Sequence, residues 1–178
     1  MRETALGGRL RLPASLAEAG VALRSQEASD RDFLEALYVS VRWDEMLPVP
    51  WTDADKRAFL ADQFRMQHRH YATYYGDAEF NIVELHAQPI GRIYLHRGPE
   101  EHRVVDVSLL PEHRGRGIGG ALMQAVIDGA AAAGCSASIN VEAFNPARRL
   151  YQRLGFLPEG PLDGPYQFLA WRPRPPSA

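Results

Sequence analysis

A glycine-rich turn, Pro111-Glu112-His113-Arg114-Gly115-Arg116-Gly117-Ile118-Gly119-Gly120, decides which fold this sequence predicts. Residues 104–110 before it are mostly apolar and predict a strand, and residues 121–133 after it have the pattern of a helix. The first N–H groups of a helix lack backbone partners, and the helix dipole favours negative charge there. Glycines let the backbone approach a phosphate without interference from a Cβ atom. The turn therefore predicts a binding site for a phosphorylated ligand.

One interpretation of the turn is a dinucleotide site. Residues 115–120 match the G-x-G-x-x-G pattern, and Glu142 follows at the end of the next expected strand. In the dinucleotide fold, however, the pattern begins directly after the strand, whereas residues 111–114 intervene here. About 58 residues follow Gly120, too few for the remaining βα units of a doubly wound sheet. Dinucleotide binding is the weaker alternative, and a Walker P-loop is excluded because no Gly-Lys-Ser/Thr follows.

The other interpretation begins at Arg114. It gives Arg114-x-x-Gly117-x-Gly119, which resembles the acetyl-CoA-binding signature Gln/Arg-x-x-Gly-x-Gly/Ala of the GNAT superfamily of N-acetyltransferases. A second block, Ala-Arg-Arg-Leu-Tyr-Gln-Arg-Leu-Gly-Phe at 147–156, resembles that family's helix ending in Leu-Gly-Phe. The resemblance is specific over residues 104–158, and the order of the expected elements extends it to 21–171.

The resemblance implies acetyl-CoA as the co-substrate and names its binding residues. In the family, the amides of the turn hold the pyrophosphate, and the main chain at the end of the fourth strand binds the pantetheine arm and polarises the thioester carbonyl. In this sequence these positions are Leu109, Leu110, Arg114, Gly115, Arg116, Gly117, Gly119 and Gly120. The family often adds an asparagine seven residues before its catalytic tyrosine. Here Asn145 lies six residues before Tyr151, and both a pantetheine contact and a helix N-cap stay open for it.

The resemblance also implies catalytic roles. Tyr151 matches the tyrosine that protonates the leaving thiolate, although an aromatic residue in a helical apolar stripe also suits a core position. The general base is less well marked, because Ile139 and Asn140 stand where some members carry a strand glutamate. Asp106 is the candidate base, since a charge among valines needs a partner or a purpose, and an ion pair is its other explanation. The alternative bases are Glu84, Glu101 and Glu142.

The acceptor is the least defined part of the expected reaction. In the family, the first two helices and their loop wall the acceptor side, which implies an aromatic set here: Trp43, Trp51, His70, Tyr71, Tyr74 and Tyr75. Such a wall favours a small amine or a peptide end over RNA. The sequence therefore predicts an N-acetyltransferase that moves an acetyl group from acetyl-CoA to a primary amine of a small molecule or peptide. A non-catalytic acyl-CoA-binding sensor is the alternative from a different functional class.

Composition adds limits on partners and location. The chain has 178 residues, 46% hydrophobic and 24% charged, and a net charge of −2, which gives no basic field for nucleic acid. No apolar run reaches the roughly 18 residues of a membrane span, and no signal core is present, so we expect a cytoplasmic protein without membrane partners. The single Cys135 fits a reducing compartment and a buried position, and the spacing of His68 and His70 predicts no metal site. A homodimer is possible, as in many proteins of this kind.

The pattern along the chain predicts one domain with two loose ends. Residues 1–20 form an expected tail, 21–171 an acetyltransferase-like domain, and 172–178 a disordered end. The fold class is mixed α/β: a mostly antiparallel sheet of six to seven strands with about four helices. Strands are expected at 21–26, 79–85, 89–96, 103–110, 138–141, 156–158 and 166–171, and helices at 30–41, 53–75, 117–133 and 146–154.

Overall fold

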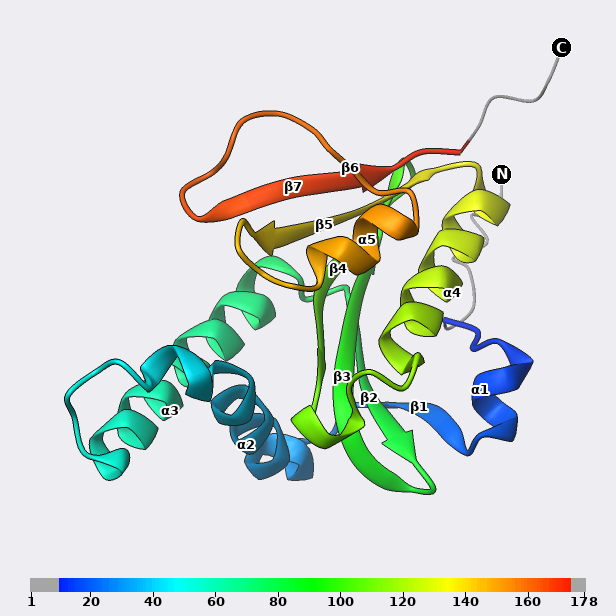
Figure 1. Ribbon diagram of the computed structural model, residues 1–178. Coiled ribbons are helices and arrows are strands. Elements are labelled where there is room, and N and C mark those ends of the chain that lie inside the picture. The colour runs from blue at the N-terminus through cyan, green and yellow to red at the C-terminus, as the bar shows by residue number, and fades with distance from the viewer. Residues whose placement is uncertain (1–9, 174–178) are drawn as a thin grey trace, which may run out of the picture.

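A seven-stranded sheet forms the centre of the molecule (Figure 1). The computed structural model describes residues 10–173. The strands follow the order β1-β2-β3-β4-β5-β7-β6, and every neighbouring pair is antiparallel except β4 and β5. Their bounds are β1 Val21–Ser25, β2 Glu79–Leu85, β3 Gln88–Arg97, β4 Glu101–Leu109, β5 Ser136–Glu142, β6 Leu157–Pro158 and β7 Tyr166–Trp171. The predicted mixed fold with a mostly antiparallel sheet is confirmed.

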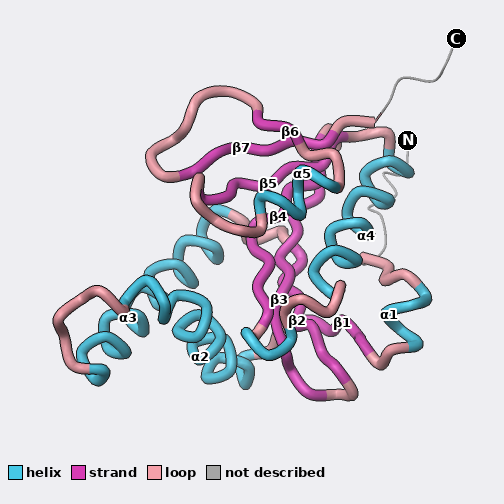
Figure 2. Tube along the Cα trace, viewed as in Figure 1, coloured by secondary structure: helices cyan, strands magenta, loops and turns pink. Residues whose placement is uncertain are grey.

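Helices cover both faces of this sheet, as the tube in Figure 2 shows. The α-helices are α1 Ala14–Glu18, α2 Arg31–Arg42, α3 Asp53–Tyr74, α4 Ile118–Ala133 and α5 Arg148–Arg153. The main apolar cluster joins α4 and α5 to one face, and a second cluster joins α2 and α3 to the other. Four of the helices are the ones expected from the sequence, and α1 is an addition.

Residues 10–20 differ from the prediction of a loose tail. Leu10 and Leu16 are only 6% and 7% exposed, and both belong to the main apolar cluster. The short helix α1 brings Leu16 onto this cluster just before β1 begins. Burial of these two leucines therefore fixes a segment that is too short for its periodicity to be visible. Residues 1–9 and 174–178 of the predicted ends lie outside the described residues.

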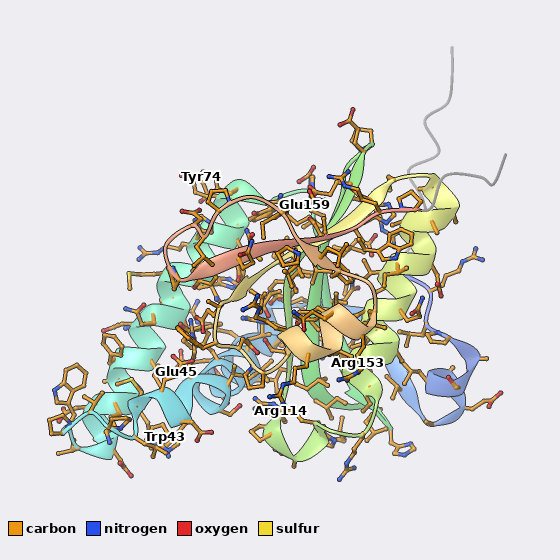
Figure 3. All side chains as sticks on the ribbon, turned by 45° about the horizontal axis from the view of Figure 1, so that its top comes forward. Trp43, Glu45, Tyr74, Arg114, Arg153 and Glu159 are labelled. Atoms are coloured by element: carbon orange, nitrogen blue, oxygen red, sulfur yellow. The ribbon has the colours of Figure 1, made fainter. Side chains whose placement is uncertain are left out.

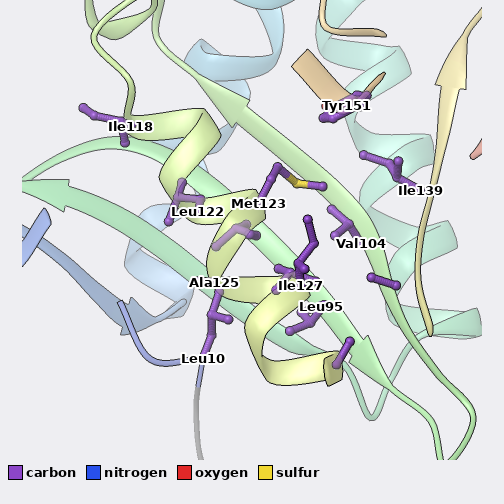
Figure 4. Packing of buried hydrophobic residues seen from close by; sticks show 14 of the residues in the cluster. Leu10, Leu95, Val104, Ile118, Leu122, Met123, Ala125, Ile127, Ile139 and Tyr151 are labelled. Atoms are coloured by element: carbon purple, nitrogen blue, oxygen red, sulfur yellow. The ribbon is translucent and has the colours of Figure 1, made fainter. Parts of the chain in front are cut away.

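Alternation along β3 explains how one strand serves two cores. Ile93 and Leu95 point into the main cluster under α4, and Figure 4 shows Leu95 among the side chains packed there. Their neighbours Arg92 and Tyr94 point to the opposite face. There the Arg92 guanidinium lies 5.0 Å from the centroid of the Tyr94 ring, and Tyr94 contacts Tyr71 of α3. Successive residues of a strand face opposite sides. The α3 face therefore carries polar side chains inside the fold.

The helix boundaries follow local capping chemistry. Thr52 accepts a hydrogen bond from the Asp55 N–H at 3.1 Å and caps α3, as predicted. Of the two predicted caps of α2, Asp30 occupies the N-cap position without a side-chain bond to the helix, because it also ends a 3₁₀ turn, Ala28–Asp30, in front of it. In that turn the Asp30 carboxylate accepts the Glu27 N–H at 2.7 Å. The helix α4 ends at Gly134, whose φ of +70° is the left-handed conformation expected after a helix.

A buried histidine makes the stability of the fold depend on pH. His102 of β4 is 5% exposed, its Nδ1 atom has no hydrogen-bond partner among residues 10–173, and it lies opposite Arg97 in the sheet. Burial, helped by the positive charge of Arg97, lowers the pKa of His102. Burial also lowers the pKa of His68. The folded protein therefore binds protons at these two imidazoles less readily than the unfolded chain, which takes them up near pH 6.5.

We expect the free energy of unfolding to fall as pH drops below about 6.5, by at most about 1.4 kcal/mol per pH unit for each histidine. The stabilising contribution is complete above the unfolded pKa and is lost as the unfolded state gains protons. Urea denaturation at pH 7.5 and 5.5 measures it. His102→Leu should flatten the dependence, whereas substitution of the exposed His70 by Leu should not. Equal slopes for wild type and His102→Leu would contradict this origin.

Candidate active site

The glycine-rich turn presents a row of unpaired amides. Before the glycines, the last N–H group with a backbone acceptor is that of Arg114, which donates to Pro111 O at 3.2 Å. After them, the first hydrogen bond of α4 runs from Ala121 N to Gly117 O at 3.0 Å. Within the described part of the chain, the N–H groups of residues 115–120 have no backbone or side-chain acceptor. The first turn of α4 contains no acidic residue and no side-chain cap. An anion would therefore find free donors and a favourable dipole here.

Three glycines of the turn have two different functions. Gly115 and Gly117 have φ values of +69° and +81°, and a Cβ atom on either would meet nothing within 4 Å. The left-handed backbone and the open space above it leave these amides accessible. Gly120 instead allows close packing, because its Cβ would lie 3.4 Å from Leu150 of α5. The first two glycines thus shape the anion site, and the last one seats α5 on α4.

The strands β4 and β5 separate next to this turn. Their parallel pairing stops at Val104 and Ile139, although β4 continues to Leu109. The Leu110 N–H is turned toward β3, where it bonds Ile90 O at 2.8 Å. Because backbone groups alternate in direction along a strand, those of Val107 and Leu109 are turned toward the β5 side, beyond the last paired residues. This edge is the only stretch of β4 where a ligand could add hydrogen bonds to the sheet.

Some of the main-chain groups of Leu109 and Leu110 that were predicted to bind pantetheine therefore already form hydrogen bonds within the protein. The Leu110 N–H belongs to the sheet, and the Leu109 carbonyl accepts a bond from Arg114 Nε at 3.0 Å. Arg114 thus folds back from the turn over the end of β4; Figure 3 labels it at the turn in front of α4. The sequence did not identify Val107 as a binding position, because a run of valines does not show which backbone amides the neighbouring strand leaves unpaired.

Tyr151 lies between α5 and the main cluster. It is 5% exposed and packs on Phe156, with ring centroids 6.1 Å apart at 64°. Figure 4 shows it at the edge of the packed side chains, near Ile139. Its hydroxyl has no hydrogen-bond partner in residues 10–173, and burial together with the charge of Asp106 raises the pKa of Tyr151 to about 12. A protonated phenol with a free O–H donor thus stands close to the strand that carries Asp106.

Asp106 is surrounded by hydrogen-bond donors. Its Oδ1 accepts bonds from Arg92 Nε at 3.1 Å and from the Ser108 hydroxyl at 2.7 Å. Its Oδ2 accepts bonds from Arg92 Nη2 at 2.9 Å and from the Tyr71 hydroxyl at 3.0 Å. A carboxylate offers about four lone-pair positions, so all are in use. The ion pair that the sequence left open as an explanation of Asp106 is present.

The partner Arg92 extends this network to α3. Its side chain is 3% exposed, and Nη2 also donates to Gln67 Oε1 at 2.8 Å. The same burial and the charge of Asp106 raise the pKa of Tyr71 far above its usual range, so that this phenol stays a donor. The network ties β3 and β4 to α3. The sequence signalled that Asp106 needs a partner, but it could not identify Arg92, which lies fourteen residues earlier.

The other candidate bases are also paired. Glu84 lies 2.6 Å from Arg24, Glu142 lies 2.7 Å from Arg42, and Glu101 lies 3.4 Å from Arg103. Of these carboxylates, Glu142 is at the end of β5, beyond the last residue that pairs with β4. Arg42, at the end of α2, is shared with Glu45, which Figure 3 labels beside Trp43.

Asn145 has an observed structural role. Its Oδ1 accepts the Ala147 N–H at 2.9 Å and thereby caps the turn that leads into α5. The helix itself begins at Arg148, two residues later than expected from Pro146. Because the N-cap of α5 is Ala147, Asn145 is not the helix N-cap expected from the sequence, and its contact with pantetheine stays a prediction.

The aromatic residues of the acceptor prediction separate into two groups. His70, Tyr71, Tyr74 and Tyr75 form one cluster at the end of α3, with His70 and Tyr74 ring centroids 4.6 Å apart. Tyr71 connects this cluster to Asp106. Trp43 and Trp51 lie at the other end of α3, as Figure 3 shows for Trp43 and Tyr74. The structure therefore brings only the first group near the candidate base.

Among residues 10–173, no group of three His, Cys, Asp or Glu side chains is arranged to hold a metal ion. In the same part of the chain, no helix has the length and apolar character needed to cross a membrane.

Comparison with known proteins agrees with this geometry. The model of the acetyltransferase (GNAT) family matches residues 28–156, well over half of the chain. No curated protein matches the sequence. Three solved structures illustrate the likeness in fold. They are the PaiA N-acetyltransferase from Thermoplasma acidophilum in complex with coenzyme A (TM-score 0.63, 16% identity, 85% of this chain and 98% of that chain), an acetyltransferase from Thermus thermophilus (0.60, 15%, 85% and 96%) and Arabidopsis thaliana Naa50 in complex with the bisubstrate analogue CoA-Ac-MVNAL (0.55, 16%, 85% and 97%).

The matched region runs from the turn before α2, through the glycine-rich turn and the diverging strands, to Phe156, three residues after the end of α5. Identity of 14 to 18% with the solved structures supports the fold only, while the family match includes both sequence blocks that form the site. The chain belongs to the GNAT acetyltransferase family.

Proposed function

We propose that this protein transfers an acetyl group from acetyl-CoA to a primary amine of a small molecule or peptide. The observation that carries the proposal is the row of unpaired amides at residues 115–120, beside the free edge of β4. The amides would hold the pyrophosphate, and Arg114 and Arg116 lie within the same turn. The edge of β4 that β5 leaves unpaired, at Val107 and at the Leu109 N–H, would bind the pantetheine arm as an additional strand does.

The chemical step is direct attack on the thioester. The amine nitrogen attacks the carbonyl carbon, the carbon–sulfur bond breaks, and the proton that the amine loses goes to a base or to water. The Tyr151 O–H donates to the sulfur as negative charge develops on it. A raised pKa suits this role, because the phenol stays protonated at the pH of the reaction.

Two routes are open for the amine's proton. Asp106 stays our predicted base, but it would have to give up one of four hydrogen bonds to accept a proton. Alternatively, Asp106 positions Tyr71 in the acceptor wall, and a water molecule or Glu142 takes the proton. The aromatic cluster of His70, Tyr71, Tyr74 and Tyr75 favours an uncharged or cationic acceptor over a polyanion.

A coenzyme-release assay tests the function. Acetyl-CoA is supplied with amino acids, peptide N-termini, polyamines or aminoglycosides, and free thiol is measured. We expect at least one amine class to release CoA. Binding of acetyl-CoA without thiol release for any acceptor would favour the sensor. Thermal stabilisation by NAD and not by CoA would overturn the assignment.

Gly117→Asn is expected to weaken CoA binding by at least about tenfold without unfolding the protein. Asparagine tolerates the left-handed conformation, and the space around the Gly117 Cβ position is empty, so the turn should keep its shape. The added side chain would then occupy the space above the amides. Calorimetric titration with CoA measures the loss.

Gly134→Asn is the matched control for this variant. Gly134 has a φ of +70°, an equally open Cβ position, and lies at the opposite end of α4. Its substitution should change the melting temperature as little as Gly117→Asn does and should leave CoA affinity intact. Equal CoA affinity for the two variants would place the cofactor elsewhere.

A further inference from the structure

A cavity lined by three arginines lies on the face of the sheet covered by α2 and α3, opposite the face covered by α4. This open cavity of about 560 Å³ is lined by Arg31 of α2 and by residues of α3. Those residues of α3 are Asp62, Arg65, Met66, His68 and Arg69. The helices α2 and α3 belong to the cluster on the face away from α4, so this cavity is separate from the acetyl-CoA site. Its volume is within the range of small-molecule sites, roughly 300–1,000 Å³.

The charges of this cavity are not balanced. Three guanidinium groups face one carboxylate, that of Asp62, which is paired with Arg65 on the same helix. The guanidiniums of Arg31 and Arg69 make no ion pair and no hydrogen bond within residues 10–173. Some arginines elsewhere in the fold pair with carboxylates, namely Arg24, Arg42, Arg92, Arg97, Arg103 and Arg172. What distinguishes Arg31 and Arg69 is that they come from two different helices and line the same cavity.

The pKa of His68, which also lines the cavity, is affected by this positive charge. His68 packs against Phe64, with ring centroids 5.7 Å apart, and burial lowers its pKa, helped by the charges of Arg31 and Arg92. The imidazole is therefore a neutral hydrogen-bonding group at neutral pH. The positive charge of the cavity comes from the arginines, whose planar forks match carboxylate and phosphate oxygens.

We infer that this cavity binds a small polyvalent anion, a phosphorylated or polycarboxylated metabolite held between Arg31 and Arg69. The two guanidiniums would bind it from α2 and α3, and His68 would add a hydrogen bond. A phosphate ester and a polycarboxylate share this chemistry. The size of the cavity and the small number of its charges suit such a molecule better than an extended acidic protein surface.

Calorimetric titration with inorganic pyrophosphate and with citrate tests the site. The full-length protein is first saturated with CoA, so that the glycine-rich turn is not available to the probe. We expect one bound anion per chain. Arg31→Gln and Arg69→Gln should each raise the dissociation constant by about tenfold or more. Arg11→Gln, which removes an exposed arginine outside the cavity, should leave it unchanged.

Asp62→Asn provides a test that misfolding cannot imitate. It removes the one carboxylate of the cavity and frees Arg65, so anion affinity should increase by several-fold. Tighter binding of pyrophosphate than of citrate assigns the ligand as a phosphate ester, and the reverse order assigns a polycarboxylate. Equal weakening in Arg11→Gln and Arg69→Gln, or no binding at millimolar concentration, would overturn the proposal.

Discussion

Tyr151→Phe is expected to lower kcat for acetyl transfer by about 10²–10⁴-fold, the usual effect of removing a general acid. The affinity for CoA should stay within about twofold, because the ring remains in place against Phe156. Stability should also change little, since the hydroxyl has no hydrogen-bond partner within the described chain and its removal leaves no group unpaired. Coenzyme-release kinetics together with CoA titration measure both quantities.

Tyr166→Phe is a suitable control, because that tyrosine is 40% exposed on β7 and its hydroxyl takes no part in the proposed chemistry. It should keep full activity. If Tyr151→Phe also keeps full activity, Tyr151 is a core residue only, as its place in an apolar stripe would allow. If it loses CoA affinity as strongly as turnover, its role is in binding.

The pH dependence of kcat should also report on Tyr151 as the general acid. Because the pKa of Tyr151 is raised to about 12, kcat should not decline between pH 7 and 9.5 through loss of its proton. Any rise over this range belongs to deprotonation of the amine or of the base. A fall centred near pH 9 in wild type and absent in Tyr151→Phe would contradict the raised pKa.

Asp106→Ala is expected to destabilise the fold by about 3–5 kcal/mol. The substitution leaves the Arg92 guanidinium buried at 3% exposure without its counter-ion, and it frees the Tyr71 and Ser108 hydroxyls as well. An uncompensated buried charge is far more costly than the loss of one hydrogen bond. Urea denaturation of wild type and variant gives the difference.

A paired replacement separates stability from catalysis. The double variant Arg92→Met with Asp106→Leu removes both charges together, and we expect it to recover most of the lost stability. If the recovered protein retains near-normal turnover, Asp106 is a positioning residue and the base lies elsewhere. If it folds but loses turnover by more than about 100-fold, Asp106 is the base. Failure to recover stability would contradict the pair as the origin of the effect.

Much of the site was accessible from the sequence, since it depends on local rules. The left-handed glycines of the turn, the end of α4 at Gly134 and the cap at Thr52 each follow from a few adjacent residues. The seven strands were also expected, because their apolar alternation is local. These features need no knowledge of what packs against them.

The remainder depends on contacts between distant segments. The pairing of Asp106 with Arg92 is set by the register of β3 on β4, including the irregularity after Tyr94, which no pattern in the sequence reveals. Leu10 and Leu16 are held in place by packing on the main apolar cluster, most of whose residues are distant from them in the sequence. The division of the acceptor wall, by contrast, follows from the expected helix itself, since Trp51 lies just before α3 and Tyr71 lies near its other end.

The short parallel pairing of β4 and β5 also has a consequence for how the chain folds. Strands β1 to β4 are built mainly from hairpins between neighbours, which can close early, while the rest of the chain is still being synthesised. The β5-β7-β6 unit can join only after the α4 crossover, and four residue pairs then hold the two halves together within the sheet. Chain order therefore makes the seam along which the pantetheine arm would lie depend on residues that are synthesised after β1 to β4. A ligand bound there would slow the separation of the two halves more than it speeds their meeting.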